Sequence, residues 1–104
     1  MDADGDDVTT HVLSVAGDVD MASAPDLYDR LTLAINDAPP GALVLLDTSG
    51  VEFCDSQGIR TLLLAHSAAH DTGRRFAIRS VPGDLERLLR IAGVLDVLVR
   101  HAAA

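Results

Sequence analysis

The stretch from Ala42 to Leu46 reads ALVLL, and it decides the fold class of this chain. It is continuously apolar rather than alternating, which is typical of a strand that helices cover on both faces. We therefore expect residues 42–46 to form a central strand of a parallel sheet. Just before it, the sequence APPG at residues 38–41 cannot continue a helix, so a new element has to begin here.

Upstream of this strand, the sequence predicts one more strand and one helix. HVLSVAG at residues 11–17 mixes Val and Leu with small residues and ends at a glycine, as short strands do. SAPD at residues 23–26 is a helix start signal, with a hydroxyl, a proline and an acid in the first turn, and the helix should end near Asn36. The expected buried stripe of this helix consists of Leu27, Leu31, Ala34 and Ile35.

Downstream, helix and strand signals continue to alternate. Gly73 should end a helix whose buried face consists of Ile59, Leu62, Leu63, His66, Ala69 and His70. RFAIRS at residues 75–80 predicts a strand, and a helix from Pro82 to Gly93 should bury Leu85, Leu88, Leu89 and Ala92. A last short strand is expected at Val97–Val99. The order implies parallel pairing through crossovers, hence an α/β layered fold with a mixed, mostly parallel sheet and helices packed on it.

Length and charge limit the organisation and the partners. With 104 residues the chain should form one domain over residues 8–104, preceded by a flexible acidic arm, MDADGDD, at residues 1–7. The net charge of −8 argues against nucleic acid and anionic membranes and favours a basic partner. No basic, apolar leader is present and apolar runs reach only about five residues, which predicts a cytoplasmic protein without a membrane segment.

Few side chains could carry metal or nucleophilic chemistry. Cys54 is the only cysteine, which excludes an internal disulfide, and we interpret it as a small buried group rather than a redox-sensitive thiol. His66 and His70 have the spacing of a metal pair, but HSAAH lacks the Glu of H-E-x-x-H and a third ligand is not evident. Ser56 lies in CDSQG rather than G-x-S-x-G. We therefore expect no metal, no cofactor and no enzymatic activity.

Two polar segments follow predicted strands, at Asp18–Asp20 and at Asp47–Gln57. The carboxyl ends of parallel strands meet at one edge of a sheet, so we expect these two loops to be neighbours and to carry the function. Within the second loop, Ser56 is placed where a helix begins. Unsatisfied backbone N–H groups and the helix dipole at such a position tolerate a phosphate.

The segment DTSGVEFCDSQG at residues 47–58 resembles the signature of STAS domains, in particular the single-domain anti-sigma factor antagonists. In that family a strand ends in D-x-S and continues to F-x-D-S-x-G at a helix start. GDVD at residues 17–20 and VPGDLERLLRIAGV at residues 81–94 are similar to two further segments of the family. The resemblance covers roughly residues 8 to 100, and three motifs in order are stronger than one. Here the chain ends soon after the last predicted strand, where many family members continue into another helix.

The resemblance implies a binding module of bacterial partner switching rather than an enzyme. Such an antagonist captures an anti-sigma factor of the serine-kinase type and thereby frees a sigma factor for transcription. The kinase inactivates it by phosphorylating the Ser of D-S-x-G, which is Ser56 here, and a serine phosphatase restores it. The expected partner-binding residues are Asp18, Val19, Asp20, Ser23, Asp55, Ser56, Gln57, Gly58 and Arg60. Homodimer formation is left open.

Several alternatives stay open on the sequence alone. Ser56 could act only as a helix N-cap, Asp18 and Asp20 could serve only to shape their loop, and Asp47 could only hold backbone N–H groups. Thr48 and Ser49 are rival phosphate acceptors with weaker support. The alternative function is that of a STAS scaffold or an accessory subunit of a signalling assembly or membrane transporter.

Overall fold

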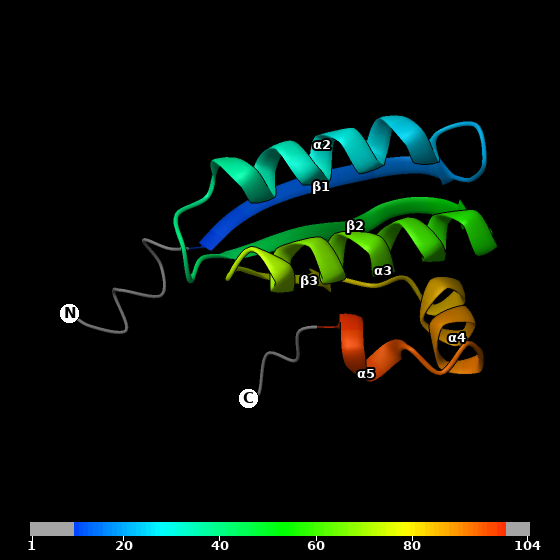
Figure 1. Ribbon diagram of the computed structural model, residues 1–104. Helices are drawn as coiled ribbons and strands as arrows, with labels where there is room; N and C mark the ends of the chain where they lie inside the picture. Colours follow the sequence, from blue (N-terminus) through cyan, green and yellow to red (C-terminus); the bar gives the residue numbers. More distant parts are fainter. Residues whose placement is uncertain (1–9, 100–104) are drawn as a thin grey trace.

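The computed structural model describes residues 10–99; the predicted acidic arm at residues 1–7 lies outside them. Within these residues the centre of the fold is a three-stranded sheet in the order β1-β2-β3 (Figure 1). The strands are β1 (Thr10–Val19), β2 (Leu43–Cys54) and β3 (Arg75–Arg79). Both neighbouring pairs are parallel. The central position that ALVLL predicts is therefore confirmed.

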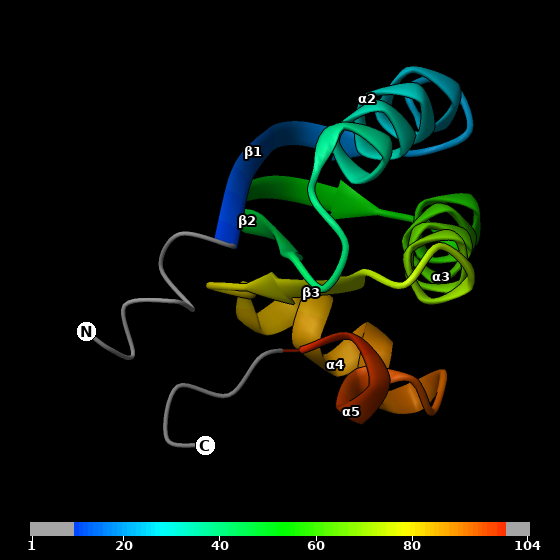
Figure 2. The same ribbon diagram turned by 60° about the vertical axis from the view of Figure 1, so that its left-hand side comes forward.

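The strands are connected by helices, which confirms the α/β class. The helices are α2 (Ala24–Asp37), α3 (Ser56–Asp71), α4 (Gly83–Ile91) and α5 (Leu95–Leu98). Figure 2 shows α2 and α3 side by side on one face of the sheet, with α4 and α5 next to β3. None of the helices between residues 10 and 99 is long and apolar enough to cross a bilayer.

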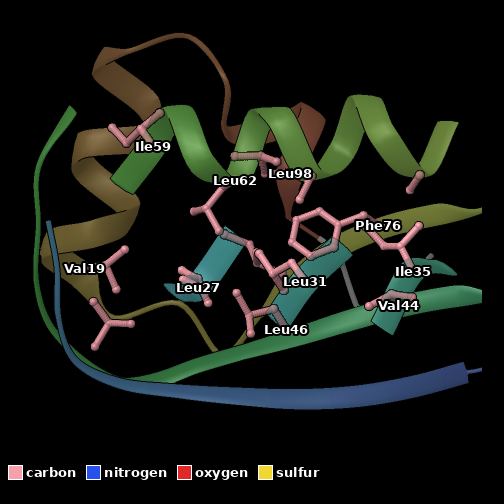
Figure 3. Packing of buried hydrophobic residues seen from close by; sticks show 14 of the residues in the cluster. Val19, Leu27, Leu31, Ile35, Val44, Leu46, Ile59, Leu62, Phe76 and Leu98 are labelled. Carbon is pink, nitrogen blue, oxygen red and sulfur yellow. The ribbon is translucent and has the colours of Figure 1, made fainter. Parts of the chain in front are cut away.

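The core is mostly aliphatic, with Phe76 of β3 among its members, and lies between the sheet and the pair α2 and α3 (Figure 3). Val44 and Leu46 of β2 point into it and are fully buried. The predicted stripe of α2 packs against them, with Leu31 at 0% and Ile35 at 1% exposure. Each such side chain contributes about 1.5–3 kcal/mol when it leaves water. These contacts fix α2 and α3 relative to the sheet, and with them the edge at which both helices begin.

The second strand is longer than the sequence predicts. Residues 47–54 were expected in a loop, yet they continue β2, and β1 likewise extends to Val19. The two strands stay paired through two irregularities in register, where β2 has extra residues against β1. Gly50 lies at the first of these, and a Cβ there would come within 2.9 Å of the Ala16 Cβ, so only glycine fits this close approach.

The C-terminal prediction is wrong in one element. Residues 97–99 were expected as a strand, but Leu95–Leu98 form the short helix α5, which buries Leu98. Only Val99 forms a bridge, with Ile78 of β3. The predicted helix faces also need small corrections, because His70 and Ala92 are exposed and Leu63, His66 and Leu88 are half-buried, whereas Ala65 is fully buried.

Candidate functional site: the edge where β1 and β2 end

The two predicted segments meet at the edge where β1 and β2 end. Val19 pairs with Cys54 in the register of the two strands. Just beyond them, the Asp55 backbone N–H donates to the Val19 carbonyl over 3.2 Å. The expectation that the two segments are neighbours is therefore confirmed, although much of each is strand rather than loop. We call the surface formed by residues 18–23 and 55–60 the rim.

Asp55, and not Ser56, caps the helix. Its carboxylate Oδ1 accepts a hydrogen bond from the Gly58 backbone N–H at 3.0 Å, which satisfies one of the free donors at the start of α3. Ser56 is the first residue of α3, and its side chain is exposed. Among the described residues none hydrogen-bonds its hydroxyl. The alternative in which Ser56 serves as the N-cap is therefore wrong, and its hydroxyl is accessible to solvent.

Gly58 fixes how closely α3 approaches β1. A Cβ at this position would lie 2.6 Å from the Val19 carbonyl oxygen and 2.7 Å from the Cys54 Sγ. Such distances are too short for any side chain, so the start of α3 can pack against the end of β1 only with glycine here. This contact joins the halves of the rim into one surface.

The loop between β1 and α2 is held by Asp20 and Ser23. The Asp20 carboxylate accepts from the backbone N–H groups of Ala22 and Ser23 at 3.0 and 3.1 Å. In return, the Ser23 hydroxyl accepts from the Asp20 N–H and donates to the Asp18 carbonyl. These are turn-forming bonds of the kind that Asp and Ser make. Asp20 thus shapes the loop, whereas the exposed Asp18 side chain makes no hydrogen bond within residues 10–99.

The predicted partner-binding residues divide into two groups. Val19 and Gly58 are buried, so they position the rim and do not reach its surface. The exposed or half-exposed residues are Asp18, Asp20, Ser23, Asp55, Ser56, Gln57 and Arg60. Arg60 makes no ion pair among the described residues, and it lies against a shallow hollow of about 310 Å³ that Met21, Tyr28 and Leu64 also line.

The two rival phosphate acceptors, Thr48 and Ser49, lie in the middle of β2 and differ in their exposure to solvent. Thr48 is 1% exposed and its hydroxyl donates to the Arg79 carbonyl of β3. It is therefore inaccessible to a kinase, while Ser49 is exposed.

Asp47 accepts from the Ser49 N–H at 2.9 Å and pairs with Arg79 at 3.3 Å. Hydrogen bonds from Ser49, and then the Arg79 guanidinium, hold the pKa of Asp47 below its usual value.

Cys54 is half-buried rather than fully buried. It packs against the edge of the core, and its thiol donates weakly to the Asp55 carbonyl at 3.5 Å. Burial, and then the nearby charge of Asp55, raise the pKa of the Cys54 thiol to about 11. A thiol in this state is a poor nucleophile at neutral pH.

His66 is half-buried and His70 exposed, and no group of metal-ligating side chains is assembled within residues 10–99.

Sequence reasoning missed an apolar groove next to the rim. It has a volume of about 510 Å³ and lies between the end of β2 and α4. Phe53 and Ile91, on its two walls, are 54% and 77% exposed. The available signal was weak: Phe53 belongs to the family signature, and Ile91 falls outside the predicted buried stripe of α4.

The start of α3, with its buried glycine, capping Asp and exposed Ser, lies within a stretch that matches a known protein family. The family described as "Mlab, STAS domain" matches residues 3–100. The chain belongs to the STAS domain family. This family membership confirms the resemblance drawn from residues 47–58.

Solved structures share the STAS fold. An anti-sigma factor antagonist from Mycobacterium paratuberculosis is 25% identical, with a TM-score of 0.75 over 91% of this chain and 80% of that chain. The anti-sigma factor antagonist SpoIIAA, in its unphosphorylated form, has a TM-score of 0.71 at 15% identity, over 89% and 80% of the two chains. A sulfate transporter family protein from Wolinella succinogenes has a TM-score of 0.70 at 16% identity, over 88% and 72%. The last two likenesses concern the fold alone.

Proposed function

We propose that this STAS domain is an anti-sigma factor antagonist that binds a kinase-type anti-sigma factor through the rim and is released when Ser56 is phosphorylated. By sequestering the anti-sigma factor it would free a sigma factor, and a serine phosphatase would return it to the binding state. The chain would be the substrate of this cycle and carry out no chemistry itself.

The observation that carries the proposal is the state of Ser56. Its hydroxyl is exposed, and the helix cap that it could have supplied is provided by Asp55 at 3.0 Å from the Gly58 nitrogen. The hydroxyl is therefore available to a kinase without loss of a structural contact. The likeness to an anti-sigma factor antagonist at 25% identity supports the same assignment.

The charge of the rim explains how a phosphate would act. Phosphorylation adds about −1.5 to −2 charges directly beside the Asp55 carboxylate. A partner surface that matches the unmodified rim would meet added bulk and repulsion. Arg60, one turn further along α3, can pair with the phosphate, but an exposed pair of this kind contributes only about 0.2–1 kcal/mol. The switch would therefore act by contact at the rim and leave the fold intact.

The test combines binding and mass measurements with purified kinase-type anti-sigma factors from the same genome. The wild-type chain should bind one of them and gain the mass of one phosphate with ATP, with the site mapped to Ser56. Ser56→Ala should bind and resist phosphorylation, because the rim is otherwise unchanged. Ser56→Asp should bind roughly tenfold or more weakly, because it places a permanent charge there.

Ser49→Ala is the matched control. Ser49 is the other exposed serine of the signature, but it lies in β2 rather than at the start of α3. This variant should be phosphorylated and bind like the wild type. Equal binding by Ser56→Ala and Ser56→Asp would refute the switch, and phosphate mapped to Ser49 would refute the acceptor.

A further inference from the structure

The groove between the end of β2 and α4 exposes apolar side chains next to the rim. Its walls are formed by residues 51–54 of β2 and by residues 82–85, 87, 88 and 91, which lie at the start of α4 and along it. Phe53 is 54% exposed and Ile91 is 77% exposed, although the same chain buries its other phenylalanine, Phe76, to 3%. Large apolar groups gathered around a hollow mark an interaction site more often than isolated ones do.

The charges around the groove indicate the chemistry of an occupant. On α4, Arg87 pairs with Asp84 at 2.8 Å and Arg90 pairs with Glu86 at 2.7 Å. Both basic groups of this helix are therefore already matched by acids of the same helix. Glu52, on the opposite wall, has no ion pair within residues 10–99. The groove is thus apolar with an unmatched negative edge, and it complements an apolar side chain that stands next to a basic one.

The groove adjoins the rim along the chain. Phe53 and Cys54 line it, and the next two residues are the helix cap Asp55 and the exposed Ser56. Figure 1 shows α4 at the end of the sheet where β2 stops and α3 begins. One partner surface that covers Ser56 can therefore also reach the groove.

We propose that the groove is a second docking point for the anti-sigma factor, and that it takes an apolar side chain flanked by Lys or Arg from that partner. This inference rests on the proposed function and identifies the partner's chemistry. The apolar side chain would pack between Phe53 and Ile91, while the basic residue would pair with Glu52. Binding at the rim depends on whether Ser56 is phosphorylated, whereas the groove contributes affinity that does not depend on this phosphorylation.

The experiment measures binding of the purified anti-sigma factor by calorimetry. Phe53→Ala and Ile91→Asp should each weaken binding roughly tenfold or more, as truncation of central apolar anchors does. Glu52→Gln should weaken it less and reduce its salt dependence. Leu33→Asp is the matched control, because Leu33 is 64% exposed on α2 and does not line the groove. It should bind like the wild type.

Each other outcome has a distinct meaning. Phe53 and Ile91 are both exposed, so their variants should keep the wild-type melting temperature, and this is measured in parallel. If both variants bind normally while Ser56→Asp binds weakly, the groove proposal is overturned and the proposed function stands. If the wild type binds no anti-sigma factor, the proposed function fails and the groove proposal with it. If light scattering shows that Ile91→Asp instead separates a dimer, the occupant is a second copy and the proposal is wrong.

Discussion

Gly58 is the residue on which the geometry of the rim depends most directly. Gly58→Ala should destabilise the fold by about 1–3 kcal/mol, as overpacking does, because the new methyl group would meet a backbone oxygen, the Val19 carbonyl, at 2.6 Å. The measurement is the free energy of unfolding in urea. Gly83→Ala is the control: a Cβ at this first position of α4 meets nothing within 4 Å. It should leave stability unchanged or raise it by up to about 1 kcal/mol. Equal effects of both would contradict the packing argument.

Cys54 permits a prediction about reactivity. Its pKa of about 11 lies well above the ordinary value of 9.0, so at neutral pH roughly a hundredfold less thiolate is present than in a free cysteine. Alkylation by iodoacetamide at pH 7.5 should be slower by a similar factor than in the urea-unfolded chain, and the rate should continue to rise up to about pH 11. A rate that levels off near pH 9.0 would show that the thiol is not perturbed.

At the scale of single residues, the sequence predicted the position of Ser56 but not its hydrogen bonding. A serine at a helix start is among the preferred N-caps, so capping and accessibility could not be separated beforehand. The preceding Asp55 decides the matter, because its carboxylate reaches the Gly58 N–H. The buried positions of Val19 and Gly58 were also missed, since only the approach of α3 to β1 buries them.

At the scale of elements, Asp47 connects β2 to β3 and makes the stability of this connection depend on pH. Its pKa is held below the ordinary 3.8, first by Ser49 and then by Arg79. A carboxyl whose pKa is lower in the folded chain than in the unfolded chain stabilises the folded state at pH values above its unfolded pKa. This stabilisation is lost as the pH falls through its folded pKa. Wild type should therefore exceed Asp47→Asn in urea midpoint at pH 7, and the difference should vanish as the pH falls below about 3.8.

A second variant checks the assigned cause. Arg79→Gln removes the ion pair at 3.3 Å but leaves the Ser49 hydrogen bonds in place. Most of the pH dependence of the urea midpoint should therefore remain in Arg79→Gln. A complete loss in this variant would show that Arg79, rather than Ser49, dominates.

The elements that the sequence predicted best have a strong period or a clear turn signal beside them. The stripe of α2 repeats with the helical period, and the turn signal APPG directly before residues 42–46 marks this continuous apolar run as a buried strand. The extension of β2 through residues 47–54 was hidden, because Gly50 and the polar residues around it are typical of loops, and the strand persists only through its pairing with β1. Val97–Val99 is too short and too apolar for its pattern to separate strand from helix, and α5 forms because Leu98 is buried in the core.

At the scale of the whole molecule, the charge of −8 determines how a basic partner would approach. The Debye length falls from about 10 Å at 0.1 M salt to about 3 Å at 1 M. We therefore expect the association rate with the anti-sigma factor to fall steeply with salt, while the dissociation rate changes less. Stopped-flow measurements between low and high salt test this. An association rate that does not depend on salt would contradict electrostatic guidance by the acidic surface.

Two variants that each remove one carboxylate test which part of the surface guides the approach of the anti-sigma factor. Asp18 is exposed on the rim, whereas Asp71 is exposed at the far end of α3, a helix of 16 residues that is about 24 Å long. The length of α3 exceeds two Debye lengths at physiological salt, so a charge at its far end acts only weakly at the rim. Asp18→Asn should therefore reduce the salt dependence of association more than Asp71→Asn, although both remove one negative charge. Equal reductions would mean that the net charge of the molecule, and not the rim, directs the encounter.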